Sequence, residues 1–144
     1  MQQAKLRILL IDDDRIYQFA ARKTIEATGF ADSILIYSNG EDAINFLKNN
    51  IDDQATLPDV IFLDVNMPVM NGWEFLDAYK NLKWSLKKPV VIYVVSSSVD
   101  EIDVSKSRQY DTVKGYIVKP VLREKFRQIL SSIPAWSTIS YTSN

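Results

Sequence analysis

The chain has 144 residues, with 17 Lys and Arg against 18 Asp and Glu, which gives a formal net charge of −1. This length is typical of a single domain, and a hydrophobic content of 47% supplies a core and excludes an intrinsically disordered chain. The near-zero net charge argues against nonspecific binding to nucleic acid or to an anionic membrane surface, so we expect no direct DNA binding.

The sequence contains neither Cys nor His. Disulfides, thiolate nucleophiles, zinc-thiolate sites and imidazole bases are therefore excluded. Carboxylates, hydroxyls, amines and backbone groups remain, and these suit oxygen-liganded cations such as Mg²⁺. The N-terminus is polar, and the longest apolar run covers only residues 90–95, so we expect neither a signal peptide nor a membrane span and predict a cytoplasmic protein.

Short apolar runs recur along the chain and predict five strands. Each run is almost continuously apolar, which is typical of strands buried on both faces of a parallel sheet. The runs cover residues 8–11, 34–37, 60–63, 90–95 and 116–118.

Segments with helical spacing lie between and after these runs. They cover residues 14–28, where Gly29 is a C-terminal stop, and residues 40–50, 71–83 and 99–110. In the last helix, one apolar face is predicted to contain Leu122, Phe126, Ile129, Leu130 and Ile133. This alternation predicts a (βα)5 doubly wound α/β domain, whose ligands bind beyond the carboxyl ends of the strands.

Polar residues follow four of the predicted strands. They are Asp12, Asp13 and Asp14 after the first strand, Asp64 after the third, Ser96 to Ser98 after the fourth, and Lys119 with Pro120 after the fifth. Clustered carboxylates repel one another and raise their own pKa values unless a cation neutralises them, which indicates a Mg²⁺ site. A lysine and a hydroxyl beside the metal suit phosphoryl oxygens, so the set predicts a site that accepts a phosphoryl group on an aspartate.

Each of these residues also has a structural explanation when taken alone. Asp14 is predicted to be a helix N-cap, and Asp12 and Asp13 could equally belong to a capping turn. Ser96 alone suits a turn, and Lys119 alone suits a solvated charge. The conjunction of four loops at one edge of the sheet is what favours a functional site.

Four strings of the sequence resemble the receiver domain of two-component response regulators. They are Ile-Leu-Leu-Ile-Asp-Asp-Asp at residues 8–14, Phe-Leu-Asp-Val-Asn-Met-Pro-Val-Met-Asn-Gly at 62–72, Val-Val-Ser-Ser at 94–97 and Gly-Tyr-Ile-Val-Lys-Pro at 115–120. Their order and spacing match the family over nearly the whole chain. The resemblance implies a flavodoxin-like five-stranded parallel sheet of strand order 2-1-3-4-5, with a receiver domain at residues 5–133 and a short tail at 134–144.

The resemblance also implies a chemistry for the site. Asp64 is expected to be the phosphoacceptor, taking its phosphoryl group from a phosphohistidine of a partner protein. Mg²⁺ is expected to be bound by Asp13, by Asp64 and by the backbone carbonyl of Asn66, while Asp12 acts mainly through a bound water. Lys119 is expected to pair with the phosphoryl group after a cis peptide bond to Pro120.

Receivers also switch conformation, and the resemblance assigns this to Ser96 and Tyr116. The Ser96 hydroxyl is expected to move toward the phosphoryl group, so that the Tyr116 ring can rotate inward and alter the surface of helix 4, strand 5 and helix 5. We favour Ser96 over Ser97 because it directly follows the apolar run. Receivers often pair through the same surface, which makes it the candidate surface for a homodimer. The resemblance also places Asn66 and Ser98 at positions that, in the family, tune the lifetime of the phosphorylated state.

Only 11 residues follow Ile133, so we expect a stand-alone, single-domain response regulator in a phosphorelay or a two-component system. Its partners are expected to be a histidine kinase or a histidine phosphotransfer protein, together with a downstream protein that the sequence does not name. We expect no enzymatic activity beyond its own phosphorylation and slow dephosphorylation.

The sequence leaves two alternative functions to weigh against this one. A receiver-like binding module that does not cycle is one, and the intact set of site residues argues against it. A phosphatase or a flavin or nucleotide binder is the other. Such a phosphatase needs a second acid where this chain has Asn66, and the scattered glycines form no phosphate-binding loop.

Two segments have open interpretations. Residues 80–89, which carry Trp84, Lys83, Lys87 and Lys88, are interpreted as a solvated loop, with a kinase contact patch as the alternative. The tail at residues 134–144 is either solvated or a partner-binding peptide that contains Trp136 and Tyr141.

Overall fold

A computed structural model of the chain describes residues 5–67 and 69–134. The strands are β1 (Leu6–Ile11), β2 (Ala31–Tyr37), β3 (Val60–Leu63), β4 (Val91–Ser96) and β5 (Val113–Val118). The helices are α1 (Arg15–Ala27), α2 (Gly40–Asn49), α3 (Gly72–Leu82), α4 (Glu101–Ser107) and α5 (Arg123–Ser131), with a 3-10 turn η1 (Lys83–Ser85) after α3. The predicted βα alternation is therefore confirmed, whereas Trp136, Tyr141 and Pro68 lie outside the described residues.

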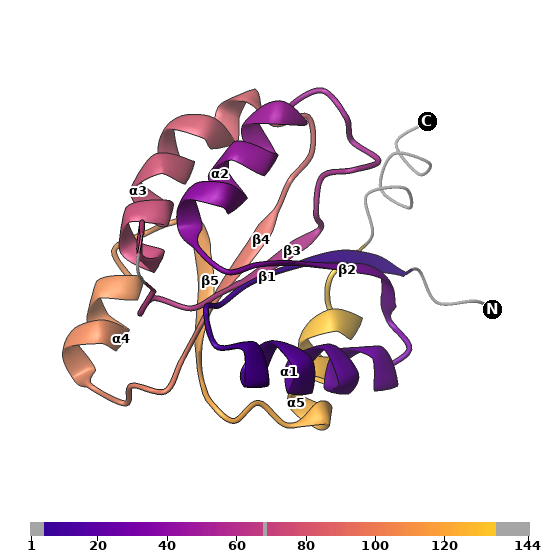
Figure 1. Cartoon of the computed structure of the whole chain (residues 1–144), viewed down its shortest axis with the longest axis vertical. Coiled ribbons are helices and arrows are strands. Elements are labelled where there is room, and N and C mark those ends of the chain that lie inside the picture. The colour runs from indigo at the N-terminus through magenta and orange to yellow at the C-terminus, as the bar shows by residue number, and fades with distance from the viewer. Residues whose placement is uncertain (1–4, 68, 135–144) are drawn as a thin grey trace.

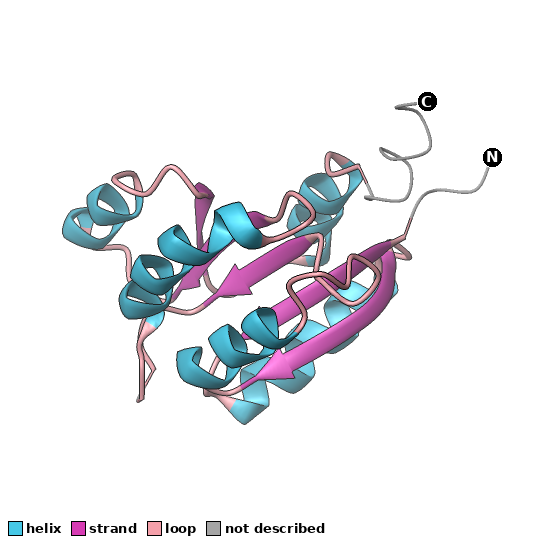
Figure 2. Cartoon of the chain, turned by 90° about the horizontal axis from the view of Figure 1, so that it is seen from above, coloured by secondary structure: helices cyan, strands magenta, loops and turns pink. Residues whose placement is uncertain are grey.

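The five strands form one parallel sheet in the order β2-β1-β3-β4-β5. Helices α1 and α5 cover one face of this sheet, and α2, α3 and α4 lie on the other side (Figures 1 and 2). This arrangement confirms the doubly wound, flavodoxin-like fold. The strand order reverses beside β1, and ligands of such sheets bind at this point, outside the carboxyl ends of the strands. Among the described helices, none has both the length and the apolar character that crossing a membrane requires.

Alternate residues of the central strands face opposite sides of the sheet. In β1, Leu9 and Ile11 join the apolar cluster under α2 and α3, whereas Ile8 and Leu10 join the cluster under α1 and α5. Because both faces are covered, a central strand needs apolar side chains at every position. This requirement explains the continuous apolar runs in the sequence.

The edge strands depart from the predicted burial. Leu35 in β2 and Val118 in β5 are 40% and 41% exposed, because each edge strand has a neighbour on one side only. Leu122 is also exposed, at 70%, since it occupies the N-cap position before the first turn of α5 and does not lie on the buried face of the helix. The prediction that Leu122 joins the apolar face of the last helix is therefore wrong.

Helix α4 is shorter than the predicted segment of residues 99–110. Its first turn is fixed by Asp100, whose carboxylate accepts the Ile102 N–H at 2.9 Å, so the helix begins only at Glu101. At the other end, the N–H groups of residues 108–110 bond to carbonyls three residues back, which is a turn rather than a continued α-helix.

The segment at residues 80–89 is solvated only in part. Trp84 is exposed as expected, but the Lys88 side chain is buried, and its Nζ lies 3.1 Å from Asp59 Oδ1 at the amino edge of the sheet. Lys88 also donates to the backbone carbonyls of Leu57 and Gln54. Burial lowers the pKa of Lys88, while the neighbouring Asp59 opposes that change. The interpretation of Lys88 as part of a solvated loop is therefore wrong.

Two glycines allow the loop after β3 to pass close to the rest of the chain. A Cβ on Gly72 would lie 2.5 Å from Val65 Cα and 2.6 Å from the Asp64 carbonyl oxygen. A Cβ on Gly40 would lie 2.5 Å from the Met70 carbonyl oxygen, which accepts the Gly40 N–H. Asn71 and Glu74 then form a capping box that starts α3. These contacts fix the backbone that carries Asp64.

We predict that Gly72→Ala destabilises the protein by about 2–3 kcal/mol, because the added methyl group overlaps backbone atoms that cannot move independently. Gly115→Ala is the control. Its Cβ would meet only the Tyr93 ring, at 3.1 Å, and a side chain can shift, so we expect a cost below about 1 kcal/mol. Urea denaturation of both variants measures the difference, and equal costs would contradict this account of the loop.

Candidate functional site

The acidic residues of the site lie at the carboxyl ends of the two central strands. Asp12 directly follows β1 and Asp64 directly follows β3, and the parallel register that pairs Ile11 with Leu63 places them side by side. Asp12 and Asp64 are buried, at 1% and 6% exposed, whereas Asp13 is exposed. One carboxylate oxygen from each of the three lies within 4.8 Å of the other two. The structure therefore brings the three predicted acids together.

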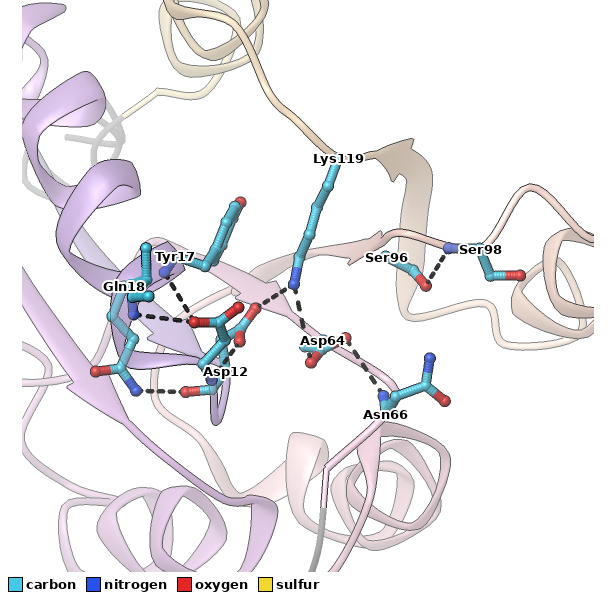
Figure 3. A network of polar contacts seen from close by, with 10 residues as sticks. Asp12, Tyr17, Gln18, Asp64, Asn66, Ser96, Ser98 and Lys119 are labelled. Atoms are coloured by element: carbon cyan, nitrogen blue, oxygen red, sulfur yellow. Dashed lines mark hydrogen bonds and ion pairs between the residues drawn. The ribbon is translucent and has the colours of Figure 1, made fainter.

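The Asp12 carboxylate already has partners for both of its oxygens (Figure 3). Oδ1 accepts the Asp14 N–H at 2.9 Å, and Oδ2 lies 2.7 Å from Lys119 Nζ. The Gln18 side-chain amide donates to the Asp12 backbone carbonyl. These bonds hold Asp12 in place and reduce its capacity to bind another group directly.

Lys119 reaches this cluster from the end of β5. Its backbone N–H donates to the Ser96 carbonyl at 2.8 Å, and the Lys119–Pro120 peptide bond is cis, as expected. Its ammonium lies 4.0 Å from Asp64 Oδ2, in addition to its close pair with Asp12. One cation thus lies between two buried carboxylates.

The electrostatics of the site leave Asp64 unusually basic. Three carboxylates share one ammonium, so the cluster carries an excess of negative charge. Burial and the charge of Asp12 raise the pKa of Asp64 to about 6, although Lys119 and the Asn66 N–H, which donates to Oδ1 at 3.3 Å, favour the ionised form. Asn66 itself is exposed. An all-oxygen donor set with excess negative charge fits a hard divalent cation.

Asp14 has the capping role that the sequence predicts. Its Oδ1 accepts the backbone N–H groups of Ile16 at 2.9 Å and of Tyr17 at 3.1 Å, and its backbone is extended. The cap starts α1 directly beside Asp12, so the helix supplies side chains to the same edge of the sheet.

Ser96 and Tyr116 both bond to the backbone of Ser98. The Ser96 hydroxyl accepts the Ser98 N–H at 3.1 Å, and the Tyr116 hydroxyl donates to the Ser98 carbonyl at 2.8 Å. Ser96 is fully buried at the end of β4, whereas Ser97 is exposed. The structure therefore places Ser96, and not Ser97, on the inside of the sheet edge.

Two residues near the site, Tyr17 and Gln18, are not predicted from the sequence. The Tyr17 ring lies against Lys119, with Nζ 4.1 Å from the ring centroid. Burial, together with the charges of Asp12 and Asp64, raises the pKa of the Tyr17 hydroxyl above its usual range. The available signal was the position of Tyr17 three residues after the capping Asp14, which places its side chain in the first turn of α1.

The family model and the relatives that match this chain identify the same family. The family model of the response regulator receiver domain matches residues 8–131. The nitrate/nitrite response regulator protein NarL of Escherichia coli is 32% identical over 133 residues, which are 92% of this chain and 56% of NarL. The probable methanogenesis regulatory protein FilR2 of Methanothrix harundinacea is 26% identical over 126 residues, which are 88% of this chain and 79% of that protein.

A solved structure agrees with the sequence relatives. The crystal structure of a two-component response regulator from Cytophaga hutchinsonii superposes with a TM-score of 0.78 at 33% identity. The match covers 87% of this chain and 94% of that one. The chain thus matches nearly the whole of that structure but only about half of NarL.

We predict that Asp64→Asn stabilises the metal-free protein near neutral pH. The folded state binds a proton on Asp64 more tightly than the unfolded chain does, because the pKa of Asp64 is raised to about 6 by folding. The stability that this protonation contributes is complete below the ordinary carboxyl pKa of about 4 and is lost as the pH rises through about 6. An uncharged Asn avoids that loss. We expect a gain of about 1–2 kcal/mol near pH 7.5, allowing for solvent screening, which shrinks toward pH 4.

Thermal denaturation in a chelator across this pH range measures the effect. Asp52→Asn is the matched control, since it removes an exposed carboxylate whose ion-pair partner, Lys87, lies 4.0 Å away. A gain for Asp64→Asn that does not change with pH would contradict the electrostatic explanation.

Proposed function

The chain belongs to the receiver domain family of response regulators, and from this premise we propose that it is a single-domain response regulator whose Asp64 accepts a phosphoryl group from a histidine kinase or a histidine phosphotransfer protein. Receiver domains are signalling switches rather than true enzymes. The observation that carries the proposal is the buried Asp64 carboxylate, which lies between Asp12, Asp13 and Lys119 at the carboxyl edge of the sheet. The proposed domain comprises residues 5–133, followed by a tail at residues 134–144. The cytoplasmic location of the protein stays a prediction.

In the proposed reaction, a carboxylate oxygen of Asp64 attacks the phosphorus of a phosphohistidine. A P–O bond forms, the P–N bond breaks, and its electron pair stays on the imidazole nitrogen of the donor. Hydrolysis of the acyl phosphate by water restores the carboxylate and releases inorganic phosphate.

Lys119 has a separate role in this proposal. Its ammonium, 4.0 Å from Asp64 Oδ2, can pair with a phosphoryl oxygen on Asp64 after a small displacement from Asp12. Such a pair stabilises negative charge where it develops during the transfer. The lysine therefore favours the phosphorylated form and the transition state over the free carboxylate.

Receiver domains bind Mg²⁺ in an acidic pocket, and the donor set here fits that ion. We assign Asp13, Asp64 and the backbone carbonyl of Asn66 as its direct protein ligands. Asp12 is assigned a water-mediated contact, since both of its oxygens are already bonded to Asp14 and Lys119. When bound, the ion neutralises charge on the carboxylates and on the phosphoryl oxygens.

The switch is proposed to act through Ser98. Phosphoryl oxygens on Asp64 attract the Ser96 hydroxyl, which then gives up its bond to the Ser98 N–H. The Tyr116 hydroxyl donates to the carbonyl of the same residue, so a change at Ser96 reaches the Tyr116 ring through the backbone of Ser98 alone. The added charge thereby shifts an equilibrium between two arrangements of the loop after β4.

The output surface is proposed to lie on α4, β5 and the start of α5. Four apolar side chains on or next to these elements are exposed, namely Val99, Ile102, Val118 and Leu122. Exposed apolar groups of this kind suit contact with another protein. A downstream target or a second copy of the chain could bind there, and phosphorylation would change the affinity through Tyr116.

We predict that acetyl phosphate adds one phosphoryl group to the protein in the presence of Mg²⁺, and that Asp64→Asn abolishes the gain. The reason is that the variant keeps the shape of the site but lacks the nucleophilic carboxylate. Intact-protein mass spectrometry measures the product, with a chelator as the negative control. Stoichiometric labelling of Asp64→Asn would refute the assignment of Asp64, and no labelling of the wild type would favour a binding module that does not cycle.

We also predict that Mg²⁺ raises the melting temperature. At a concentration ten times the dissociation constant, the expected gain is about 1.4 kcal/mol, which corresponds to roughly 3–5 °C for a domain of this size. Asp13→Asn should reduce the gain because it removes a proposed ligand that is exposed in the folded protein. An identical melting temperature in chelator and in excess Mg²⁺ would count against the metal site.

A further inference from the structure

Tyr17 lies beside the lysine of the site. It is in the first turn of α1, and Asp14 Oδ1 accepts its backbone N–H at 3.1 Å, which fixes its backbone at the start of the helix. The ring faces the Lys119 side chain, as Figure 3 shows. Lys119 Nζ is 4.1 Å from the ring centroid, closer than the 4.7–5.5 Å of the other lysine–aromatic contacts among the described residues.

The Tyr17 ring lies on a third side of the Lys119 ammonium, in addition to Asp12 and Asp64. Asp12 Oδ2 lies 2.7 Å from Nζ, and Asp64 Oδ2 lies 4.0 Å away. Because lysine has a long and flexible stem, an ammonium held only by Asp12 has many accessible positions. An aromatic face attracts a cation and limits these positions. The Lys119 side chain is accordingly only 17% exposed.

The hydroxyl of Tyr17 makes no comparable contribution. Its oxygen is buried and has no hydrogen-bond partner among the described residues. The ring also packs beside the apolar cluster under α1 and α5. The contact with Lys119 is therefore made by the aromatic face, a property that phenylalanine shares and an aliphatic side chain lacks.

We propose that Tyr17 is a positioning residue for phosphoryl transfer, whose ring face holds the Lys119 ammonium between Asp12 and Asp64. This inference rests on the proposed function of Asp64. Lys119 can turn from Asp12 toward a phosphoryl group on Asp64 while it stays over the ring. The ring thus keeps the ammonium within reach of the reacting group throughout the transfer.

The first test compares labelling rates with acetyl phosphate and Mg²⁺ for Tyr17→Phe and Tyr17→Leu. Tyr17→Phe keeps the aromatic face and should react within about twofold of the wild type. Tyr17→Leu should react more slowly, by roughly threefold to thirtyfold, in the maximal rate rather than in the half-saturating donor concentration. Tyr17→Met replaces the leucine variant should the latter fail to fold.

Phe19→Leu is the matched control. Phe19 is also an aromatic residue of α1 with a lysine over its ring, Lys23 at 5.2 Å, but it is 65% exposed and takes no part in the proposed site. It should leave the labelling rate unchanged. A wild-type rate for Tyr17→Leu, or an equal loss for Tyr17→Phe, would overturn the inference.

A second measurement does not require phosphorylation. An aromatic face at 4.1 Å shifts the NMR signals of the Lys119 ε-methylene protons upfield by its ring current. We expect this shift in the wild type and in Tyr17→Phe, and its loss in Tyr17→Leu. Should the wild type take up no phosphoryl group, the proposed function fails. The NMR shift still decides whether Tyr17 positions Lys119, and its absence from the wild type would overturn that claim.

Discussion

The repulsion among Asp12, Asp13 and Asp64 is the constraint on which the site depends. Buried carboxylates are unfavourable, and the pairing of β1 with β3 nonetheless places two of them side by side. Lys119 offsets part of the charge, while burial and the charge of Asp12 raise the pKa of Asp64. The stability of the sheet thus holds in place a group of charges that would otherwise separate.

The sequence was informative where one physical requirement acts on neighbouring residues. Central strands must be apolar on both faces, so residues 8–11 and 60–63 could be recognised as strands of a parallel sheet. The carboxyl ends of parallel strands meet at one edge, so the sequence alone groups Asp12, Asp64, Ser96 and Lys119. Asp14 was recognised as a cap because its effect is confined to the next three residues.

The sequence failed where the environment of a side chain comes from distant segments. Leu35 and Val118 are as apolar as core residues, and their exposure follows from the strand order rather than from the apolar runs in which they lie. Lys88 lies in a stretch that contains other lysines, and its burial follows from Asp59, on a different segment. Tyr17 contacts a lysine that is far away in the sequence, and no local pattern indicates this.

The buried pair of Lys88 and Asp59 has a consequence for the whole domain. This pair lies at the amino edge of the sheet. Its opposite charges neutralise each other, and both side chains are buried away from dissolved ions. The carboxyl edge, in contrast, has more carboxylates than cations. The uncompensated buried charge therefore lies at the carboxyl edge, where it attracts cations and repels anions. For the proposed phosphoryl transfer, this charge favours arrival of the cation before an anionic phosphodonor, and the preference weakens as ionic strength rises.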